Sequence, residues 1–217
     1  MIERFAAHDL RAGGTDATRD LLTGALNRHG LTALIDRIAG SARRGRGITL
    51  LMVDVDGLAS VDSDYGERAG DEVRVTIAHR LRLFVAPHDS VARVARNVFA
   101  CILCQGPDSP IAIDMTKEML AAIAWPVDVP GGTVMLRGAA GIAAATAGAR
   151  TAERQLAAAR VAMEWVVARG HGGHCVYEPG VDPAGFHEAI DGDCAQALVQ
   201  AAHHTRPIEP AHSSRAA

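Results

Sequence analysis

Four aspartates are the residues of this chain whose type and spacing could do chemistry. Asp54 and Asp56 close an apolar run at residues 48–55, and residues two apart in a strand point to the same face. Carboxylates at the end of a buried strand can bind a hard cation such as Mg²⁺, although an Asp-Gly turn that merely ends the strand explains them equally simply. Asp62 and Asp71 follow. Asp71 stands at the expected start of a helix, where it could cap the helix or accept hydrogen bonds from a nucleobase.

Cysteine and histidine offer a second kind of site. The four cysteines of this 217-residue chain are too few for a disulfide scaffold. Cys101 and Cys104 form a CxxC inside an expected strand, where this spacing points the thiols to opposite faces, so we expect buried cysteines. His171, His174 and Cys175 follow one another closely in a stretch that we interpret as a solvated turn. A zinc site shared with the CxxC is the alternative.

The composition limits the classes of function. Hydrophobic residues make up 48% of the chain and charged residues 22%, which is ordinary for a folded globular domain. Aromatic residues are only 4%, so the surface is short of rings that stack on single-stranded nucleic acid. With a formal net charge of −3, the chain has no overall positive charge that would attract a polyanion. Lys117 is the only lysine. We therefore expect no nucleic-acid partner.

The domain organisation follows from where apolar periodicity begins and ends. We expect one domain over residues 20–178, preceded by a lead-in segment at 1–19 and followed by a tail at 179–217. The tail could hold one further helix and is otherwise expected to be mobile. The charged amino terminus lacks the apolar stretch of a signal peptide, and no run of about 18 apolar residues occurs. These features predict a cytoplasmic protein without a membrane span.

Hydrophobic periodicity predicts the elements that must position the candidate residues. Apolar residues at helical spacing, bounded by capping residues, Gly or Pro, predict helices over 27–42, 70–85, 109–125 and 151–169. Apolar runs of strand length predict strands over 48–55, 90–94, 98–104, 133–144 and 174–177. The second and third strands form a tight hairpin that turns at residues 95–97. This order predicts an α/β fold in which a mixed sheet is covered by helices.

Three segments together resemble the GGDEF domain of diguanylate cyclases, over residues 20 to about 178. Residues 20–28 are similar to the opening DxLTGLxNR segment of that family, residues 51–57 to its metal-binding strand, and residues 66–71 to the GHxxGD motif that follows. The resemblance implies a palm-like, nucleotide-cyclase-type sheet that contains antiparallel strands and is surrounded by helices. It also implies the family's reaction, in which two GTP molecules are joined into cyclic di-GMP across a dimer of domains.

The signature of the family is broken in this chain. Its Gly-Gly-Asp/Glu-Glu-Phe corresponds to Ala95, Arg96, Asn97, Val98 and Phe99, so only the phenylalanine is retained. The two glycines let a substrate approach the hairpin tip, whereas Arg96 places a bulky side chain there. In the family the acidic third residue binds a metal and activates the attacking 3′-hydroxyl. Asn97 can lend an oxygen to Mg²⁺ but cannot accept a proton at neutral pH.

The resemblance also assigns a metal site and a base site. Asp54 and the backbone carbonyl of Val55 match the remaining metal ligands, so we expect at most weak Mg²⁺ binding and no firmly implied cofactor. Asp71 matches the guanine-binding aspartate. Asp62 stands where the family has an asparagine that contacts the same base. A carboxylate can accept both the N1 and N2 donors of guanine, which leaves weak guanine nucleotide binding open.

The phosphate contacts and the inhibitory product site of the family are depleted. Ala59, Val167 and His171 stand where the family has a lysine, a second lysine and an arginine. In the inhibitory RxxD motif the aspartate is retained as Asp89, but Ala86 replaces the arginine. Arg82 or Arg93 would have to move in to replace it, because an arginine fork supplies both charge and planar stacking.

These losses predict a catalytically degenerate GGDEF domain that serves as a regulatory or interaction module in cyclic di-GMP signalling. We expect it to act as a homodimer or paired with another GGDEF protein, with turnover reduced by roughly 10⁴ or more. The alternative is a diguanylate cyclase that works with altered ligands, for which the retained Asp54 and Asp71 are the support. A receptor that binds GTP or cyclic di-GMP without turnover is a third hypothesis.

Overall fold

A five-stranded mixed sheet in the order β2-β3-β1-β6-β7 forms the centre of the molecule. The structure is a computed structural model that describes residues 17–41, 48–86, 90–103, 109–145, 152–170 and 172–177. The described elements are, in chain order, α1 (Arg28–Ser41), β1 (Ile48–Asp56), α2 (Leu58–Tyr65), α3 (Glu67–Phe84), β2 (Ser90–Arg93), β3 (Val98–Leu103), α4 (Pro110–Ile123), β4 (Val127–Val129), β5 (Gly132–Val134), β6 (Arg137–Ala145), α5 (Ala152–Val167) and β7 (Gly173–Val176).

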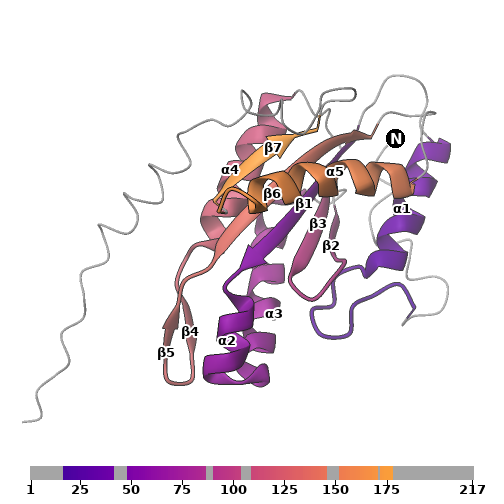
Figure 1. Ribbon diagram of the computed structural model, residues 1–217. Helices are drawn as coiled ribbons and strands as arrows, with labels where there is room; N and C mark the ends of the chain where they lie inside the picture. The colour runs from indigo at the N-terminus through magenta and orange to yellow at the C-terminus, as the bar shows by residue number, and fades with distance from the viewer. Residues whose placement is uncertain are drawn as a thin grey trace, which may run out of the picture.

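The central strand β1 explains why its sequence is an almost unbroken apolar run. It is antiparallel to both neighbours, β3 and β6, while β7 adds to β6 in parallel. Side chains alternate along β1, so that Leu51, Val53 and Val55 pack with α3 and α4. Leu50 and Met52 pack on the opposite face with α1 and α5. Figure 1 shows α5 crossing one face of the sheet, with α3 and α4 behind it.

The predicted α/β fold is confirmed, but one helix was not predicted and one predicted strand is wrong. The helix α2 was not predicted, because it is short and its buried apolar residues are only Leu58 and Val61. The strand predicted over 133–144 is divided between two sheets. β5 pairs with β4 in a separate two-stranded sheet, and only β6 enters the main sheet. Gly131, with φ of 102°, supplies the tight turn between β4 and β5.

Several predictions concern residues that the structure does not describe. Residues 1–16 of the expected lead-in and the whole expected tail at 179–217 lie outside the described residues, so the domain boundaries stay predictions. Asp89, Cys104 and His171 lie outside them as well. Within the part of the chain that is described, no helix is long and apolar enough to cross a membrane.

Candidate functional site

The candidate site lies where β1 runs into α2 and the β2–β3 turn passes beside it. The backbone N–H of Val55 donates to the carbonyl oxygen of Asn97 at 3.0 Å, which ties the hairpin tip to the end of β1. Gly57 and Gly66, both with positive φ, form the corners before and after α2. These short connections place α2, the start of α3 and the hairpin tip next to one another.

A buried arginine, Arg74 of α3, occupies the space between the two predicted base-binding residues. Its side chain is only 1% exposed. Its Nη1 and Nη2 donate to the two carboxylate oxygens of Asp62 at 2.8 and 2.6 Å, which is a bidentate pair. Longer contacts join Nη1 to Asp71 at 3.4 Å and Nη2 to Asn97 Oδ1 at 3.3 Å. Nε donates to the carbonyl oxygen of Arg96 at 3.2 Å. The five N–H groups of this guanidinium therefore all face acceptors.

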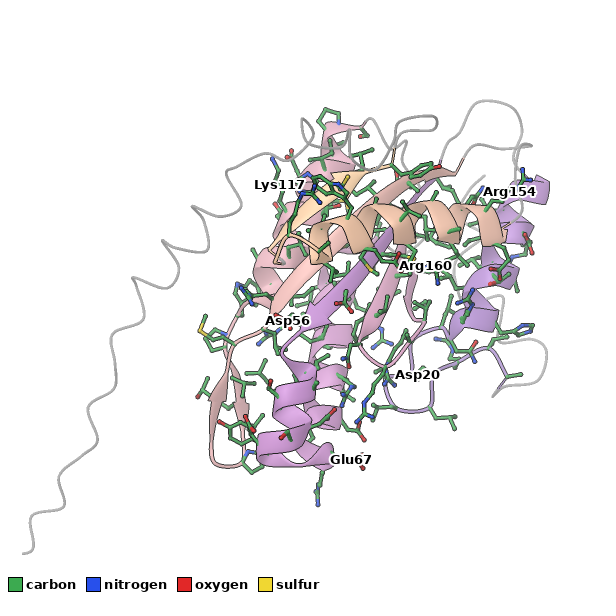
Figure 2. The ribbon with its side chains drawn as sticks, in the orientation of Figure 1. Asp20, Asp56, Glu67, Lys117, Arg154 and Arg160 are labelled. Atoms are coloured by element: carbon green, nitrogen blue, oxygen red, sulfur yellow. The ribbon has the colours of Figure 1, made fainter. Side chains whose placement is uncertain are left out.

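Arg96 at the hairpin tip brings a second cation to the same carboxylate. Its Nη2 donates to Asp62 Oδ2 at 2.9 Å and lies 3.7 Å from Glu67 Oε1, while 62% of the side chain remains exposed. Figure 2 labels Glu67 at the start of α3. The hydrogen bonds from Arg74 hold the pKa of Asp62 below its usual value, and burial only partly opposes them. The same pairing raises the pKa of Arg74.

The backbone of α3 is shaped to admit the Asp62 carboxylate. A Cβ atom on Gly70 would collide with Asp62 Oδ1, so only glycine allows the carboxylate to lie against the helix at this point. Of the two alternatives for Asp71, the one in which it caps this helix is wrong. The N-cap is Gly66, α3 begins at Glu67, and the side chain of Asp71 is 52% exposed beyond the first turn.

Sequence reasoning missed Arg74, although a signal for it existed. Arg74 lies on the stripe of α3 that also carries the buried residues Val73, Ile77 and Leu81. A charged residue on a buried stripe needs a paired partner, because an unpaired buried charge is costly. That signal predicts a buried carboxylate nearby without saying which one.

The two aspartates at the end of β1 share one face of the strand, and the Asp56 carboxylate is paired with an arginine. Asp54 and Asp56 alternate with Val55 and therefore lie on the strand face that packs with α1 and α5. The Asp56 carboxylate accepts hydrogen bonds from Arg137 at 3.0 Å and from the N–H of Gly57 at 2.8 Å. Figure 2 labels Asp56 at this end of β1, next to β6.

The donor set at this end of the sheet does not fit the two-carboxylate metal centre of a phosphoryl-transfer enzyme. Of the predicted ligands, Asp54 is the one carboxylate, and the amide oxygen of Asn97 already accepts a hydrogen bond from Arg74. Across the described residues, no group of three or more His, Cys, Asp or Glu side chains gathers for a metal ion. His174 and Cys175 are buried neighbours in β7 and point to opposite faces.

The other predicted site positions are spread along the edges of the fold. Ala59 lies exposed in the first turn of α2, Val167 is the half-buried last residue of α5, and Ala86 lies exposed after α3. The guanidinium of Arg169, two residues after Val167, lies 3.6 Å from the centre of the Trp165 ring.

The two arginines considered as substitutes in the inhibitory site are both engaged. Arg82 donates to the carbonyl oxygen of Thr23 at 2.9 Å. Arg93 pairs with Asp20 at 3.0 Å and donates to the carbonyl oxygen of Arg96. Neither side chain is available to replace the missing arginine without breaking these contacts.

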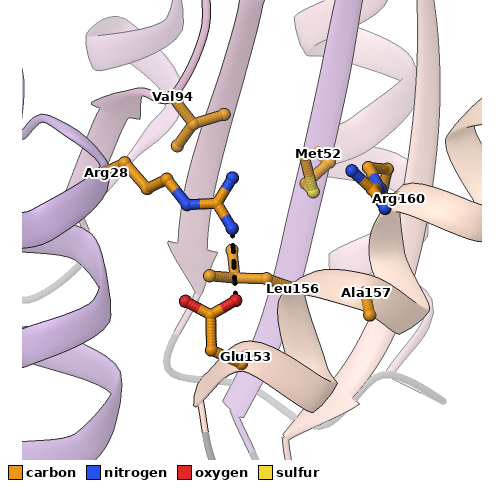
Figure 3. A pocket seen from close by; sticks show the side chains of 7 residues that line it. All are labelled: Arg28, Met52, Val94, Glu153, Leu156, Ala157 and Arg160. Carbon is orange, nitrogen blue, oxygen red and sulfur yellow. Dashed lines mark hydrogen bonds and ion pairs between the residues drawn. The ribbon is translucent and has the colours of Figure 1, made fainter.

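One cavity lies away from Asp62 and Arg74, and a second lies beside the hairpin tip. A cavity of about 70 Å³ lies between α1, β1 and α5, bordered by Met52 and Leu156 and by the Arg28–Glu153 ion pair at 3.1 Å (Figure 3). It is too small for a nucleotide, since ligand pockets are typically about 300–1,000 Å³. A more open groove beside the hairpin tip is bordered by Arg93 and Arg96, whose charges are already paired with carboxylates.

The sheet, the helices on its two faces and the hairpin beside the acidic end of β1 define a nucleotide-cyclase-type α/β domain. The chain belongs to the GGDEF family: residues 17–172 match the family described as "Diguanylate cyclase, GGDEF domain". Its place in that family makes it a GGDEF-domain protein of cyclic di-GMP signalling.

Solved and curated relatives agree with this assignment. The GGDEF-domain structure of TpbB (YfiN) from Pseudomonas aeruginosa is 27% identical, with a TM-score of 0.67, and the match covers 74% of this chain and 94% of that one. An uncharacterized signaling protein from Caulobacter vibrioides is 29% identical over 161 residues, or 72% of this chain. The bifunctional diguanylate cyclase/cyclic di-GMP phosphodiesterase MucR of P. aeruginosa is 26% identical over 163 residues, or 75% of this chain. The match spans only 20% and 24% of these two curated proteins.

Proposed function

We propose that this chain is a catalytically degenerate GGDEF domain that acts as a regulatory or interaction module in cyclic di-GMP signalling. The observation that carries the proposal is the Arg74 guanidinium, which takes the acceptors of Asp62, Asp71 and Asn97 at once. A cyclase of this family needs the first two residues to bind the guanine of GTP. At the third position it needs an acidic residue that binds the metal.

The chemistry of the hairpin supports the same proposal. An amide at position 97 cannot accept the proton of an attacking 3′-hydroxyl at neutral pH. The neighbouring Arg96 covers the tip with a side chain that is bonded to Asp62. Removal of one preorganised electrostatic group typically lowers a rate by about 10²- to 10³-fold, and several are missing here.

The functional partner in this proposal is another GGDEF domain, either a second copy or an intact cyclase, in the cytoplasm. The test is to titrate the purified chain into an active diguanylate cyclase and follow cyclic di-GMP formation. We expect the rate of the cyclase to change in a saturable way as the complex forms. An unchanged rate over a wide concentration range would argue against the regulatory role.

The alternative is a diguanylate cyclase with altered ligands, and Asp54 at the end of β1 is the residue that favours it. Asp54→Ala separates the two proposals. An enzyme must lose its activity in this variant, whereas a regulatory module keeps its effect on the partner cyclase. Ser63→Ala, on the exposed surface of α2, is a matched control that should change neither property.

A further inference from the structure

We propose that the Arg74 side chain fills the space between Asp62 and Asp71, which we call the base-recognition corner. The chain itself then occupies the place where a guanine would bind. This inference rests on the proposed role of Asp62 and Asp71 in base recognition. It goes further by giving the Arg74 side chain the place of the base and by predicting that its removal opens that place again.

The argument begins with the donor pattern that the Asp62 carboxylate accepts. Arg74 presents two parallel N–H groups to its two oxygens, at 2.8 and 2.6 Å. Guanine presents a similar pair of parallel donors at N1 and N2, which a single carboxylate can also accept. The guanidinium adds a positive charge that the neutral base lacks, and charge-assisted bonds are roughly twice as strong as neutral ones. A guanine therefore competes with a stronger donor that is already in place.

The surroundings make Arg74 hard to displace. The side chain is 1% exposed and is held by α2 through Asp62 and by the hairpin tip through Asn97 and the carbonyl oxygen of Arg96. Admission of a base to the Asp62 carboxylate would require the two Arg74–Asp62 hydrogen bonds to break. When only a small fraction of molecules is in the open state, the apparent affinity falls by that fraction.

The backbone of α3 also leaves room for the Arg74–Asp62 pair. Gly70 leaves the room in which the Asp62 carboxylate lies against α3, and a Cβ there would also approach Arg74 Nη1 at 2.8 Å. The pair joins residues 12 apart in the sequence across two helices. The arginine is therefore a fixed part of the packing.

The experiment compares nucleotide binding by the whole chain and by two variants, using calorimetry with GTP and with ATP. Arg74→Met removes the guanidinium but keeps an unbranched side chain that suits a helix. The double variant Asp62→Asn with Arg74→Met removes both buried charges, so it leaves no buried unpaired carboxylate and should fold even where the single variant does not. Arg68→Met is the matched control on the same helix, because Arg68 is 94% exposed.

We expect the unaltered chain and Arg68→Met to show no preference for GTP over ATP. In the double variant, the Asp71 carboxylate and the new amide at position 62 become available to a base. We therefore expect GTP to bind at least about tenfold more tightly than to the unaltered chain. A folded double variant that gains no GTP affinity would overturn the inference. Guanine-selective binding by the unaltered chain, without product, would overturn it while leaving the proposed function intact.

Cyclic di-GMP formed by the unaltered chain in the same mixtures would instead overturn the proposed function, and the comparison with the double variant would still report whether Arg74 limits affinity. A second measurement needs no variant. The Nε–H resonance of Arg74 should keep its chemical shift when excess GTP is added, because the side chain stays bonded to Asp62 and the hairpin. A saturable shift with GTP but not with ATP would contradict the inference.

Discussion

Arg74 and Asp62 form a pair in which the loss of either partner alone is costly. Arg74 is 1% and Asp62 12% exposed, so each charge depends on the other in place of water. We expect Arg74→Ala to lower the free energy of unfolding by about 3 kcal/mol, because Asp62 keeps only the exposed Arg96 as a partner. Chemical denaturation measures this value. Arg68→Ala should change it by less than about 0.5 kcal/mol, and equal effects of the two substitutions would refute the burial argument.

The same carboxylate should make stability depend on pH. Because the folded-state pKa of Asp62 is lowered, its contribution is present above the ordinary aspartate value of about 3.9 and is lost as pH falls through the folded value. The difference in unfolding free energy between the unaltered chain and Asp62→Asn should therefore be constant near neutral pH. It should shrink below about pH 3.9. Denaturation curves measured at a series of pH values test this, and a difference that stays constant in acid would count against it.

At the scale of elements, the contact between α2 and α3 depends on Gly70, which has no side chain. In an exposed helix interior, Gly→Ala usually stabilises by about 1 kcal/mol. At Gly70 the added Cβ would collide with Asp62 Oδ1, so we expect Gly70→Ala to destabilise the chain instead. Thermal unfolding gives the sign, with Ser63→Ala on α2 as the control. A higher melting temperature for Gly70→Ala would show that the contact is not needed.

A substitution at the hairpin tip tests whether an acidic residue at position 97 alone restores cyclase activity. In Asn97→Asp the new carboxylate would lie within reach of Arg74 Nη2, which contacts Asn97 Oδ1 at 3.3 Å. It should pair with that arginine and leave no free acid for a metal or a proton. We expect this variant to fold and to form no cyclic di-GMP, as judged by chromatography after incubation with GTP and Mg²⁺. Product formation by this single variant would mean that the acid alone had been missing.

How far the sequence predicts these elements depends on the range of the interactions that fix them. Apolar periodicity is local, so β1, α3 and the β2–β3 hairpin could be placed from it. The helix α2 and the small β4–β5 sheet could not, because each is short and is fixed by packing and turn geometry. The Arg74–Asp62 pair joins two helices through side chains, and no local pattern specifies which carboxylate meets a buried arginine.

At the scale of the whole molecule, the chain keeps the GGDEF fold while its site has changed. The family match over residues 17–172 and the TM-score of 0.67 to the TpbB domain show the fold. The Asp62 carboxylate, which stands at the predicted base site, lies against Arg74 and Arg96 of the chain itself. In the proposed function, the fold serves pairing with another GGDEF domain, while these arginine contacts close the site to the reaction of the family.

The central claim is that this domain does not synthesise cyclic di-GMP. The most direct measurement is to incubate the purified chain with GTP and Mg²⁺, and separately with Mn²⁺, and to detect cyclic di-GMP by chromatography beside an intact cyclase as the positive control. We predict no product above a blank without protein. Product that disappears in Asp54→Ala would contradict the claim and show that Asn97 and the altered ligands support catalysis.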